Sequence, residues 1–211
     1  TKPIMVLLYG FPGAGKTHFA RNLAEHLECA VVHSDRIRHE LFEEPRFDEQ
    51  ENDIVTHLMG YMSEEFLNAG VNVVYDTNAM RKSQRLELRE LARKKQAKTI
   101  VVWFQIDPDT SFARLNKRDR RTADDKFATE YTQSEFRAYA SRMQPPEPTE
   151  DYVVVSGKHT FGSQKNALFK KLMEMGLIDT QSAHNKVAKP GLINLIPKGR
   201  VDMSRRNINI R

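Results

Sequence analysis

A glycine-rich segment between an apolar run and an amphipathic run limits the folds that are open to this chain. Residues 10–17 read Gly-Phe-Pro-Gly-Ala-Gly-Lys-Thr, which matches the phosphate-binding pattern Gly-x-x-x-x-Gly-Lys-[Ser/Thr]. The glycines let successive backbone N–H groups turn toward the β- and γ-phosphates, and the helix that follows directs its positive end at the anion. Lys16 adds a positive charge, and Thr17 offers a hydroxyl to Mg²⁺. We therefore predict a site for ATP or GTP at Gly10, Gly13, Ala14, Gly15, Lys16, Thr17 and His18.

Apolar runs rich in β-branched residues alternate with helical patterns along the chain. The strand-like runs cover residues 4–9, 30–33, 71–75, 99–106 and 152–155. The patterns between and after them predict helices over about 16–27, 49–69, 82–95, 108–118, 133–143 and 163–175. Such alternation is typical of a parallel sheet with crossover helices. We predict an α/β protein with the P-loop NTPase fold, in which a five-stranded parallel sheet has helices on both faces and a helical arginine lid.

Composition favours a soluble globular protein, because 39% of the residues are hydrophobic and 29% are charged. No apolar run approaches the ~20 residues of a membrane span, so we expect no contact with a membrane. Cys29 is the single cysteine, which rules out an intramolecular disulfide. This cysteine usage and the lack of a signal-peptide pattern lead us to expect a cytoplasmic location.

Polar residues follow two of the predicted strands, where parallel sheets carry their active sites. Asp35 follows the second strand, where its carboxylate would face the γ-phosphate as the base for an attacking hydroxyl. Arg38 comes about one helical turn later, so it shares the face of Asp35 and could hold a charged acceptor. Asp76, Thr77 and Asn78 follow the third strand as candidate acceptor ligands, and Asp76 is also a candidate Mg²⁺ ligand. Alternatively, Asp35 caps a helix and the other three residues build a turn.

Basic residues recur at helical spacing after the fourth strand, at Arg114, Lys117, Arg118 and Arg121. A helix with arginines on one face, followed by a polar loop, fits a lid that neutralises charge in a transition state and excludes water. A solvated basic helix explains the same pattern. Arg118 and Arg121 lie nearest the loop, so we predict them as catalytic residues beside Lys16 and Asp35.

The basic charge of the chain is concentrated near its end. Residues 179–211 hold seven basic and two acidic residues, a surplus that equals the net charge of +5 for the whole chain. We therefore divide the chain into a P-loop domain over 1–178, with its lid at about 114–130, and a basic tail over 179–211. The tail is either solvated, docked onto its own domain, or a contact for nucleic acid or for another protein.

The P-loop, the segment Ser34 to Arg38, the segment Asp76 to Asn78 and the lid together resemble the kinase domain of polynucleotide 5′-kinases. Zeta-toxin-like and related small-molecule P-loop kinases are close neighbours of that family. The resemblance covers about residues 4–177. It implies that Asp35 is the general base on the acceptor hydroxyl, that Arg38 holds a phosphate of the acceptor, and that a lid arginine acts on the transferred phosphate. The implied activity is ATP-dependent phosphate transfer, with a polynucleotide 5′-OH as the favoured acceptor.

Two other functions remain open at this point. A small acceptor (a sugar nucleotide, nucleoside, sugar acid or antibiotic) could be held by the segment 42–57, whose acidic stretch 43–49 would repel a polyanion. The third alternative is a nucleotide-gated binding module that transfers no phosphate. Asp35 and Arg38 argue against it, because a switch needs no acceptor base.

Overall fold

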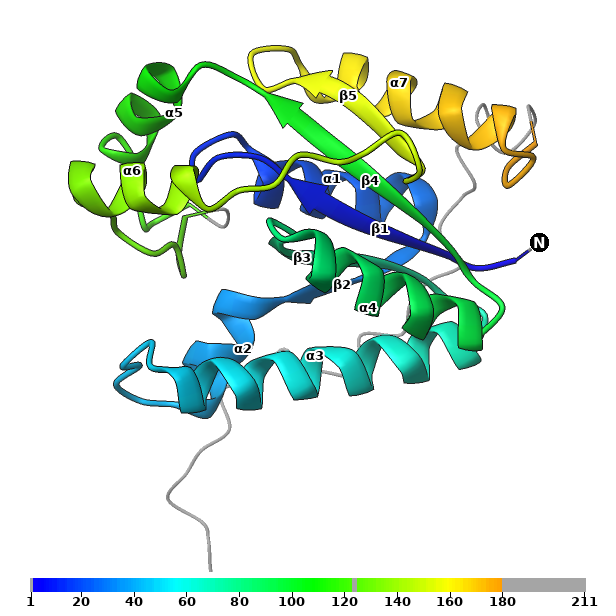
Figure 1. The fold of residues 1–211 in the computed structure, drawn as a ribbon, viewed down its shortest axis with the longest axis horizontal. Helices are drawn as coiled ribbons and strands as arrows, with labels where there is room; N and C mark the ends of the chain where they lie inside the picture. Colours follow the sequence, from blue (N-terminus) through cyan, green and yellow to red (C-terminus); the bar gives the residue numbers. More distant parts are fainter. Residues whose placement is uncertain (1, 123–124, 180–211) are drawn as a thin grey trace, which may run out of the picture.

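The computed structural model describes residues 2–122 and 125–179, so the basic tail lies outside the described residues except for Asp179. Five parallel strands of these ranges form one sheet in the order β2-β3-β1-β4-β5 (Figure 1). The strands are β1 Ile4–Tyr9, β2 Cys29–His33, β3 Asn72–Asn78, β4 Lys98–Gln105 and β5 Tyr152–Ser156. The predicted five-stranded parallel sheet is confirmed. Because β1 is the central strand, the glycine-rich loop leaves the middle of the sheet.

Helices follow each of the strands. They are α1 Lys16–Leu27, α2 Ser34–Leu41, α3 Glu49–Asn68, α4 Lys82–Lys94, α5 Pro108–Leu115, α6 Gln133–Ser141 and α7 Phe161–Glu174. The start of α5 is fixed by Asp107, whose side chain accepts a hydrogen bond from the backbone N–H of Thr110. The start of α6 is fixed by a reciprocal capping box between Thr132 and Glu135.

One predicted helix is shorter than expected, and the difference matters for the lid. Helix α5 ends at Leu115, because the N–H groups of Lys117 and Arg118 bond to the carbonyls of Arg114 and Leu115, three residues back. The basic residues from 114 to 121 therefore do not share one face of a helix, which corrects the expected helical arginine lid. The lid segment after α5 is built mainly of turns.

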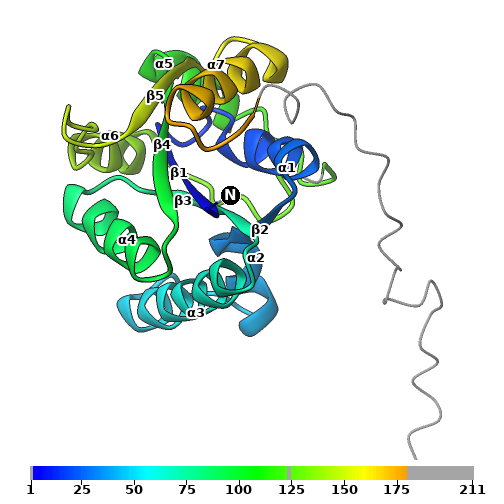
Figure 2. The same cartoon turned by 90° about the vertical axis from the view of Figure 1, so that its right-hand side faces the viewer.

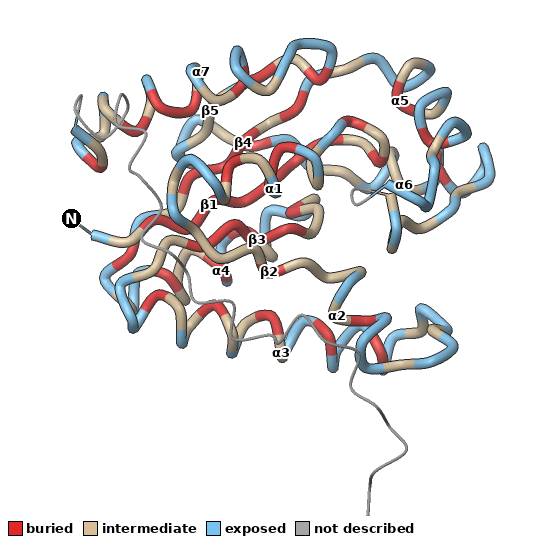
Figure 3. Tube along the Cα trace, turned by 180° about the vertical axis from the view of Figure 1, so that it is seen from behind, coloured by how far each residue is buried: buried red, intermediate tan, exposed pale blue. Residues whose placement is uncertain are grey.

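The sheet is covered on both faces, as Figure 2 shows. On one face Ile4, Val6 and Leu8 of β1 pack with α1 and α7, and on the other Met5 and Leu7 pack with α3 and α4. This alternation follows from the two-residue period of a strand. Buried positions concentrate along the central strands in Figure 3. No helix in residues 2–122 and 125–179 is long and apolar enough to cross a membrane.

The glycine-rich loop is pressed against α5. Gly13 has a φ of +88°, and a Cβ placed there would lie 2.4 Å from the backbone oxygen of Ser111. The hydroxyl of Ser111 donates a hydrogen bond of 2.8 Å to the carbonyl of Pro12. Glycine is therefore required at position 13 both for the backbone conformation and for the close approach of α5.

Candidate active site

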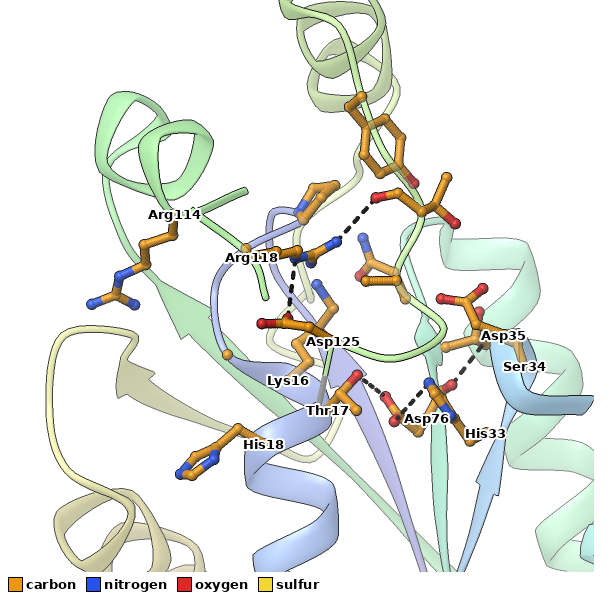
Figure 4. A pocket seen from close by; sticks show the side chains of 18 of the residues that line it. Lys16, Thr17, His18, His33, Ser34, Asp35, Asp76, Arg114, Arg118 and Asp125 are labelled. Atoms are coloured by element: carbon orange, nitrogen blue, oxygen red, sulfur yellow. Dashed lines mark hydrogen bonds and ion pairs between the residues drawn. The ribbon is translucent and has the colours of Figure 1, made fainter. Parts of the chain in front are cut away.

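A cavity of about 340 Å³ opens at the carboxyl ends of β1, β2 and β3, where the sequence places its candidate residues (Figure 4). Eight predicted residues line it. They come from the glycine-rich loop, the start of α1, the start of α2 and the end of β3: Gly13, Gly15, Lys16, Thr17, Asp35, Asp76, Thr77 and Asn78. His18 and Arg118 also line it. Gly10, Ala14, Arg38 and Arg121 of the predicted set do not belong to the lining. Gly10 and Ala14 lie buried in the loop itself.

Lys16 lies across the glycine-rich loop. Its Nζ donates hydrogen bonds of 2.8 Å to the carbonyls of Gly10 and Phe11, which holds the ammonium group at the mouth of the loop. Burial lowers the pKa of Lys16 to about 7, although the charges of Asp76 and Asp35 act to raise it. The group is therefore divided between its charged and neutral forms near neutral pH, and a polyanion would favour the charged form.

Thr17 and Asp76 form a pair that fits the Mg²⁺ ion of a bound nucleotide. The hydroxyl of Thr17 donates to Oδ1 of Asp76 at 3.4 Å, and Nε2 of His33 lies 3.5 Å from Oδ2 of the same carboxylate. Asp76 is 4% exposed. Mg²⁺ is held through one or two carboxylates with phosphates and waters, so a hydroxyl and a carboxylate suffice. No group of three or more His, Cys, Asp or Glu in the described residues could hold a metal ion alone.

Asp35 lies in the first turn of α2, and it does not cap the helix. The N-cap position belongs to His33, and no side-chain hydrogen bond closes this end. The carboxylate of Asp35 instead lines the cavity opposite the P-loop. Burial raises the pKa of Asp35, the neighbouring His33 partly offsets this rise, and the charge of Asp76 adds to it. A buried carboxylate with a raised pKa is a stronger proton acceptor than a solvated one.

The turns after α5 bring one arginine into the cavity and leave another outside. Nη1 of Arg118 donates to the carbonyl of Thr129 at 3.0 Å, and its Nε lies 3.5 Å from Asp125, so both ends of the lid segment meet at this side chain. Burial lowers the pKa of Arg118, a shift that Asp125 opposes. Arg121, in contrast, has a side chain that is 93% exposed and paired with Asp119. Arg121 therefore lies outside the lining of the cavity, and its catalytic role stays a prediction.

Arg38 also lies elsewhere than the sequence suggested. Its Nη1 donates to Glu51 at 3.1 Å, its Nη2 donates to Asn52, and its guanidinium lies 4.8 Å from the centre of the Phe47 ring. The side chain is 7% exposed. Helical spacing correctly placed Arg38 one turn after Asp35, but the N-terminal turn of α3 packs against α2 and captures the guanidinium. Arg38 therefore lies outside the lining of the cavity, and its role as a ligand of the acceptor stays a prediction.

Other lining residues carry chemistry that the sequence analysis missed. They are His33, Ser34, Asp125, Thr129, Tyr131 and Tyr139. Burial lowers the pKa of His33, so its imidazole is neutral at pH 7. The position of His33 at the end of β2, one strand from Asp76, was the available signal for this residue. Ser34 begins α2, and Asp125 and Thr129 belong to the predicted lid segment. Tyr131 and Tyr139 lie just before and within α6, and no local pattern in the sequence relates these two tyrosines to the P-loop.

The lowered pKa of Lys16 gives an expected dependence of nucleotide affinity on pH. Above pH 7 the free protein carries mostly neutral Lys16, so ATP must bind together with a proton. We expect the dissociation constant for ATP to rise by up to about tenfold per pH unit above pH 7. Titration calorimetry in buffers of different ionisation enthalpy would measure both the affinity and the proton uptake. Lys16→Met should bind ATP more weakly without this pH dependence, and a flat wild-type profile from pH 6.5 to 8.5 would contradict the assignment.

The fold is shared with solved kinase structures. A gluconokinase from Sinorhizobium meliloti matches with a TM-score of 0.58 and 16% identity, covering 82% of this chain and 92% of its own. The APS kinase CysC of Mycobacterium tuberculosis, solved with AMPPNP and APS, matches with a TM-score of 0.61 and 16% identity over 82% and 98% of the two chains. Kti12 of Chaetomium thermophilum, solved with ADP-AlF3, matches with a TM-score of 0.61 and 16% identity over 84% and 100%.

Sequence comparison identifies the family. No protein of curated function is similar enough in sequence to match this chain. A family profile described as "AAA domain" matches residues 5–146, which include the P-loop, Asp35, Asp76 and the lid segment. The match extends over more than half of the chain, and the strands and helices it covers form the P-loop fold described above. The chain therefore belongs to this AAA-domain family.

Proposed function

We propose that the protein is an ATP-dependent kinase that transfers the γ-phosphate to a hydroxyl group of a small molecule. One observation carries this proposal: the carboxylate of Asp35 lines the same cavity as Lys16 and Thr17 of the P-loop. A protein that only binds or switches with a nucleotide has no need for a base at this place. The fold shared with a gluconokinase and an APS kinase supports the same class of reaction.

The proposed reaction follows from where the side chains lie. The acceptor hydroxyl gives its proton to the carboxylate of Asp35, and its oxygen forms a bond to the γ-phosphorus while the bond to the β,γ-bridging oxygen breaks. ADP leaves with the electron pair of that bond. Lys16 and Arg118 bring positive charge to the oxygens of the transferred group and the leaving phosphate. Arg118 also links Asp125 to Thr129, which keeps the lid segment over the cavity.

Thr17 and Asp76 would hold the Mg²⁺ ion of a bound nucleotide. The bound ion supplies neutralisation of the phosphate charge and fixes the geometry of the triphosphate. His33, which is neutral and lies 3.5 Å from Asp76, supports the orientation of this carboxylate. Ser34 adds a hydrogen bond of 3.4 Å from its hydroxyl to the backbone oxygen of Asp76.

A small acceptor is favoured over a polynucleotide 5′-OH by the surroundings of Arg38. A polynucleotide carries a phosphate next to the reacting end, and the resemblance assigned this phosphate to Arg38. The guanidinium is instead engaged by Glu51 and Asn52 and is nearly closed to solvent. Glu51 is in turn fixed by the N–H groups of Arg46 and Phe47, at 2.9 to 3.0 Å. Freeing Arg38 for a substrate would take from the buried carboxylate of Glu51 its buried partner and leave only the exposed Arg46, at 3.7 Å.

A direct transfer assay tests this proposal. The full chain is incubated with γ-labelled ATP, Mg²⁺ and either 5′-OH oligonucleotides or small hydroxyl compounds, and the labelled products are separated. We expect label on small compounds and little label on oligonucleotides. Label on oligonucleotides alone would retain the kinase and reject the small acceptor. ATP hydrolysis that no acceptor stimulates would support the nucleotide-gated module instead.

A further inference from the structure

We propose that Tyr131 and Tyr139 form the acceptor subsite, and that the acceptor is a neutral polyhydroxylated ring such as a sugar or the ribose of a nucleoside. This inference rests on the proposed kinase function and specifies its substrate class. The two rings line the cavity and stand nearly perpendicular, with centroids 5.8 Å apart and an interplanar angle of 70°. Both side chains are half-buried, so each keeps part of its ring surface accessible.

The two phenols lie close to the group that would take the acceptor's proton. Burial is the main cause that raises the pKa of both tyrosines, and the negative charge of Asp35 contributes to the rise in each. Asp35, Tyr131 and Tyr139 line the same cavity. Tyr131 directly precedes Thr132, the N-cap of α6, and Tyr139 projects from the same helix. A single element thus positions both rings beside the cavity.

Tyr139 is also tied to the P-loop. Its oxygen accepts a hydrogen bond of 2.9 Å from Nδ2 of Asn78, and Oδ1 of Asn78 accepts one of 3.2 Å from the backbone N–H of Gly10. Both the nitrogen and the oxygen of the Asn78 amide take part in these two hydrogen bonds. The hydroxyl proton of Tyr139 can then be donated to an oxygen of the acceptor. The side chain of Asn78 therefore fixes the distance between the acceptor subsite and the P-loop.

The charges around the cavity favour a neutral acceptor. Its lining cations are Lys16, Arg114, Lys117 and Arg118. Lys16 bonds to the carbonyls of the P-loop, Arg114 donates to the carbonyl of Gly157 at 2.7 Å, and Arg118 is held within the lid. Lys117, the fourth, lies in the turn after α5, so all four lining cations come from α1, α5 and the segment after α5. The elements that carry Asp35 and the tyrosines add no lysine or arginine to the lining of the cavity. An additional phosphate near Asp35 would face two carboxylates, Asp35 and Asp76.

The chemistry of the remaining lining suits the C–H face and the hydroxyls of a sugar ring. Aromatic faces bury the apolar C–H surface of such a ring, and perpendicular rings can contact two sides of it. Ser34, Thr77 and the Tyr139 hydroxyl can exchange hydrogen bonds with its hydroxyl groups. An acceptor that lacks those hydroxyls would leave polar groups of the cavity without partners.

Matched pairs of acceptors test the substrate class. Each neutral ring is compared with its anionic derivative: adenosine with adenosine 3′-phosphate, glucose with glucuronate, and further monosaccharides and nucleosides with their phosphates. We expect kcat/KM to be at least about tenfold higher for a neutral member, since none of the cations that line the cavity comes from the elements around Asp35. Transfer only to anionic members, or equal rates within each pair, would overturn this inference and retain the kinase. Transfer to no hydroxyl compound would overturn both.

Substitutions test the two tyrosines separately from folding. With the best neutral acceptor of that panel, we expect Tyr131→Leu to raise the acceptor KM by about tenfold while the KM for ATP stays near the wild-type value. Tyr131→Phe retains the ring and should restore most of the affinity, and Tyr139→Phe should raise the acceptor KM through the lost hydroxyl. Tyr61→Leu, at a tyrosine that is 59% exposed on α3, is the matched control. An unchanged acceptor KM in Tyr131→Leu and Tyr139→Phe, or an equal rise for ATP, would overturn the assignment.

Discussion

Asp35→Asn is expected to lower kcat for phosphate transfer by about 10²- to 10⁴-fold, the usual contribution of a positioned general base. Asparagine has nearly the size of aspartate but cannot take the acceptor's proton. Because Asp35 projects from α2 and not from the P-loop, the KM for ATP should change little. Steady-state kinetics with a fixed acceptor and varied ATP would separate these two parameters. A variant that keeps more than about a tenth of wild-type kcat would reject Asp35 as the base.

The pH profile provides an independent check on Asp35. Burial raises the pKa of Asp35 above that of a solvated aspartate. As the pH is lowered, the wild-type rate should therefore begin to fall at a higher pH than it would with a solvated carboxylate as the base. The residual rate of Asp35→Asn should lack this limb. Asp53→Asn, at an exposed carboxylate of α3, is the matched control and should retain the wild-type rate and profile. Thermal unfolding of both variants shows whether the fold is retained.

Local patterns were sufficient for the parts of the site that depend on short stretches of chain. The P-loop can be recognised from the sequence because each residue of its motif has a steric or electrostatic role. Gly13, for example, adopts a positive φ. The positions of Asp35 and Asp76 followed from a general property of parallel sheets, whose carboxyl strand ends meet at one edge. The periodicity of apolar residues gave α1 and α4 to within a residue.

Side chains whose partners are distant in sequence could not be placed in this way. Arg38 and Glu51 come from different helices, and only the packing of α2 on α3 brings them together. Arg121 was expected over the cavity because helical spacing was extended beyond Leu115, where α5 ends. The Asn78–Tyr139 hydrogen bond joins residues separated by 61 positions. Such contacts depend on the assembled fold, which no local propensity determines.

Arg85 is the clearest residue of this kind, and its role is structural. It is 2% exposed in α4, and its Nε and Nη2 donate to the two carboxylate oxygens of Glu150 at 2.7 and 3.0 Å. The guanidinium also donates to the carbonyls of Ala79, Gln144 and Pro145 at 2.8 to 3.2 Å. Arg85 therefore joins the chain after β3 to the proline-rich segment after α6. These two segments lead to Asn78 and Tyr139, so the ion pair also supports the site.

Arg85→Leu is expected to destabilise the protein by about 3 to 5 kcal/mol, because it leaves the carboxylate of Glu150 and several carbonyls without their buried partner. This corresponds to a fall in Tm of roughly 6 to 20 °C for a domain of this size. Burial raises the pKa of Glu150, but hydrogen bonds from Arg85 and the backbone of Glu147 lower it to below its ordinary value. The difference in unfolding free energy between wild type and variant should therefore have its full size above the ordinary pKa of a glutamate. It should shrink as the pH falls through the lowered pKa of Glu150.

The double variant Arg85→Leu/Glu150→Leu separates the cost of a stranded charge from the value of the ion pair. Removing both charges should recover part of the stability lost in Arg85→Leu, because no carboxylate is then left unpaired in the interior. The control is Arg93→Leu on the same helix, whose partner is Glu90 and whose side chain is 71% exposed. It should change stability by less than about 1 kcal/mol. Urea unfolding at constant m-value would measure the unfolding free energy of all three variants. Equal losses of stability in Arg85→Leu and Arg93→Leu would show that the buried pair does not hold these segments together.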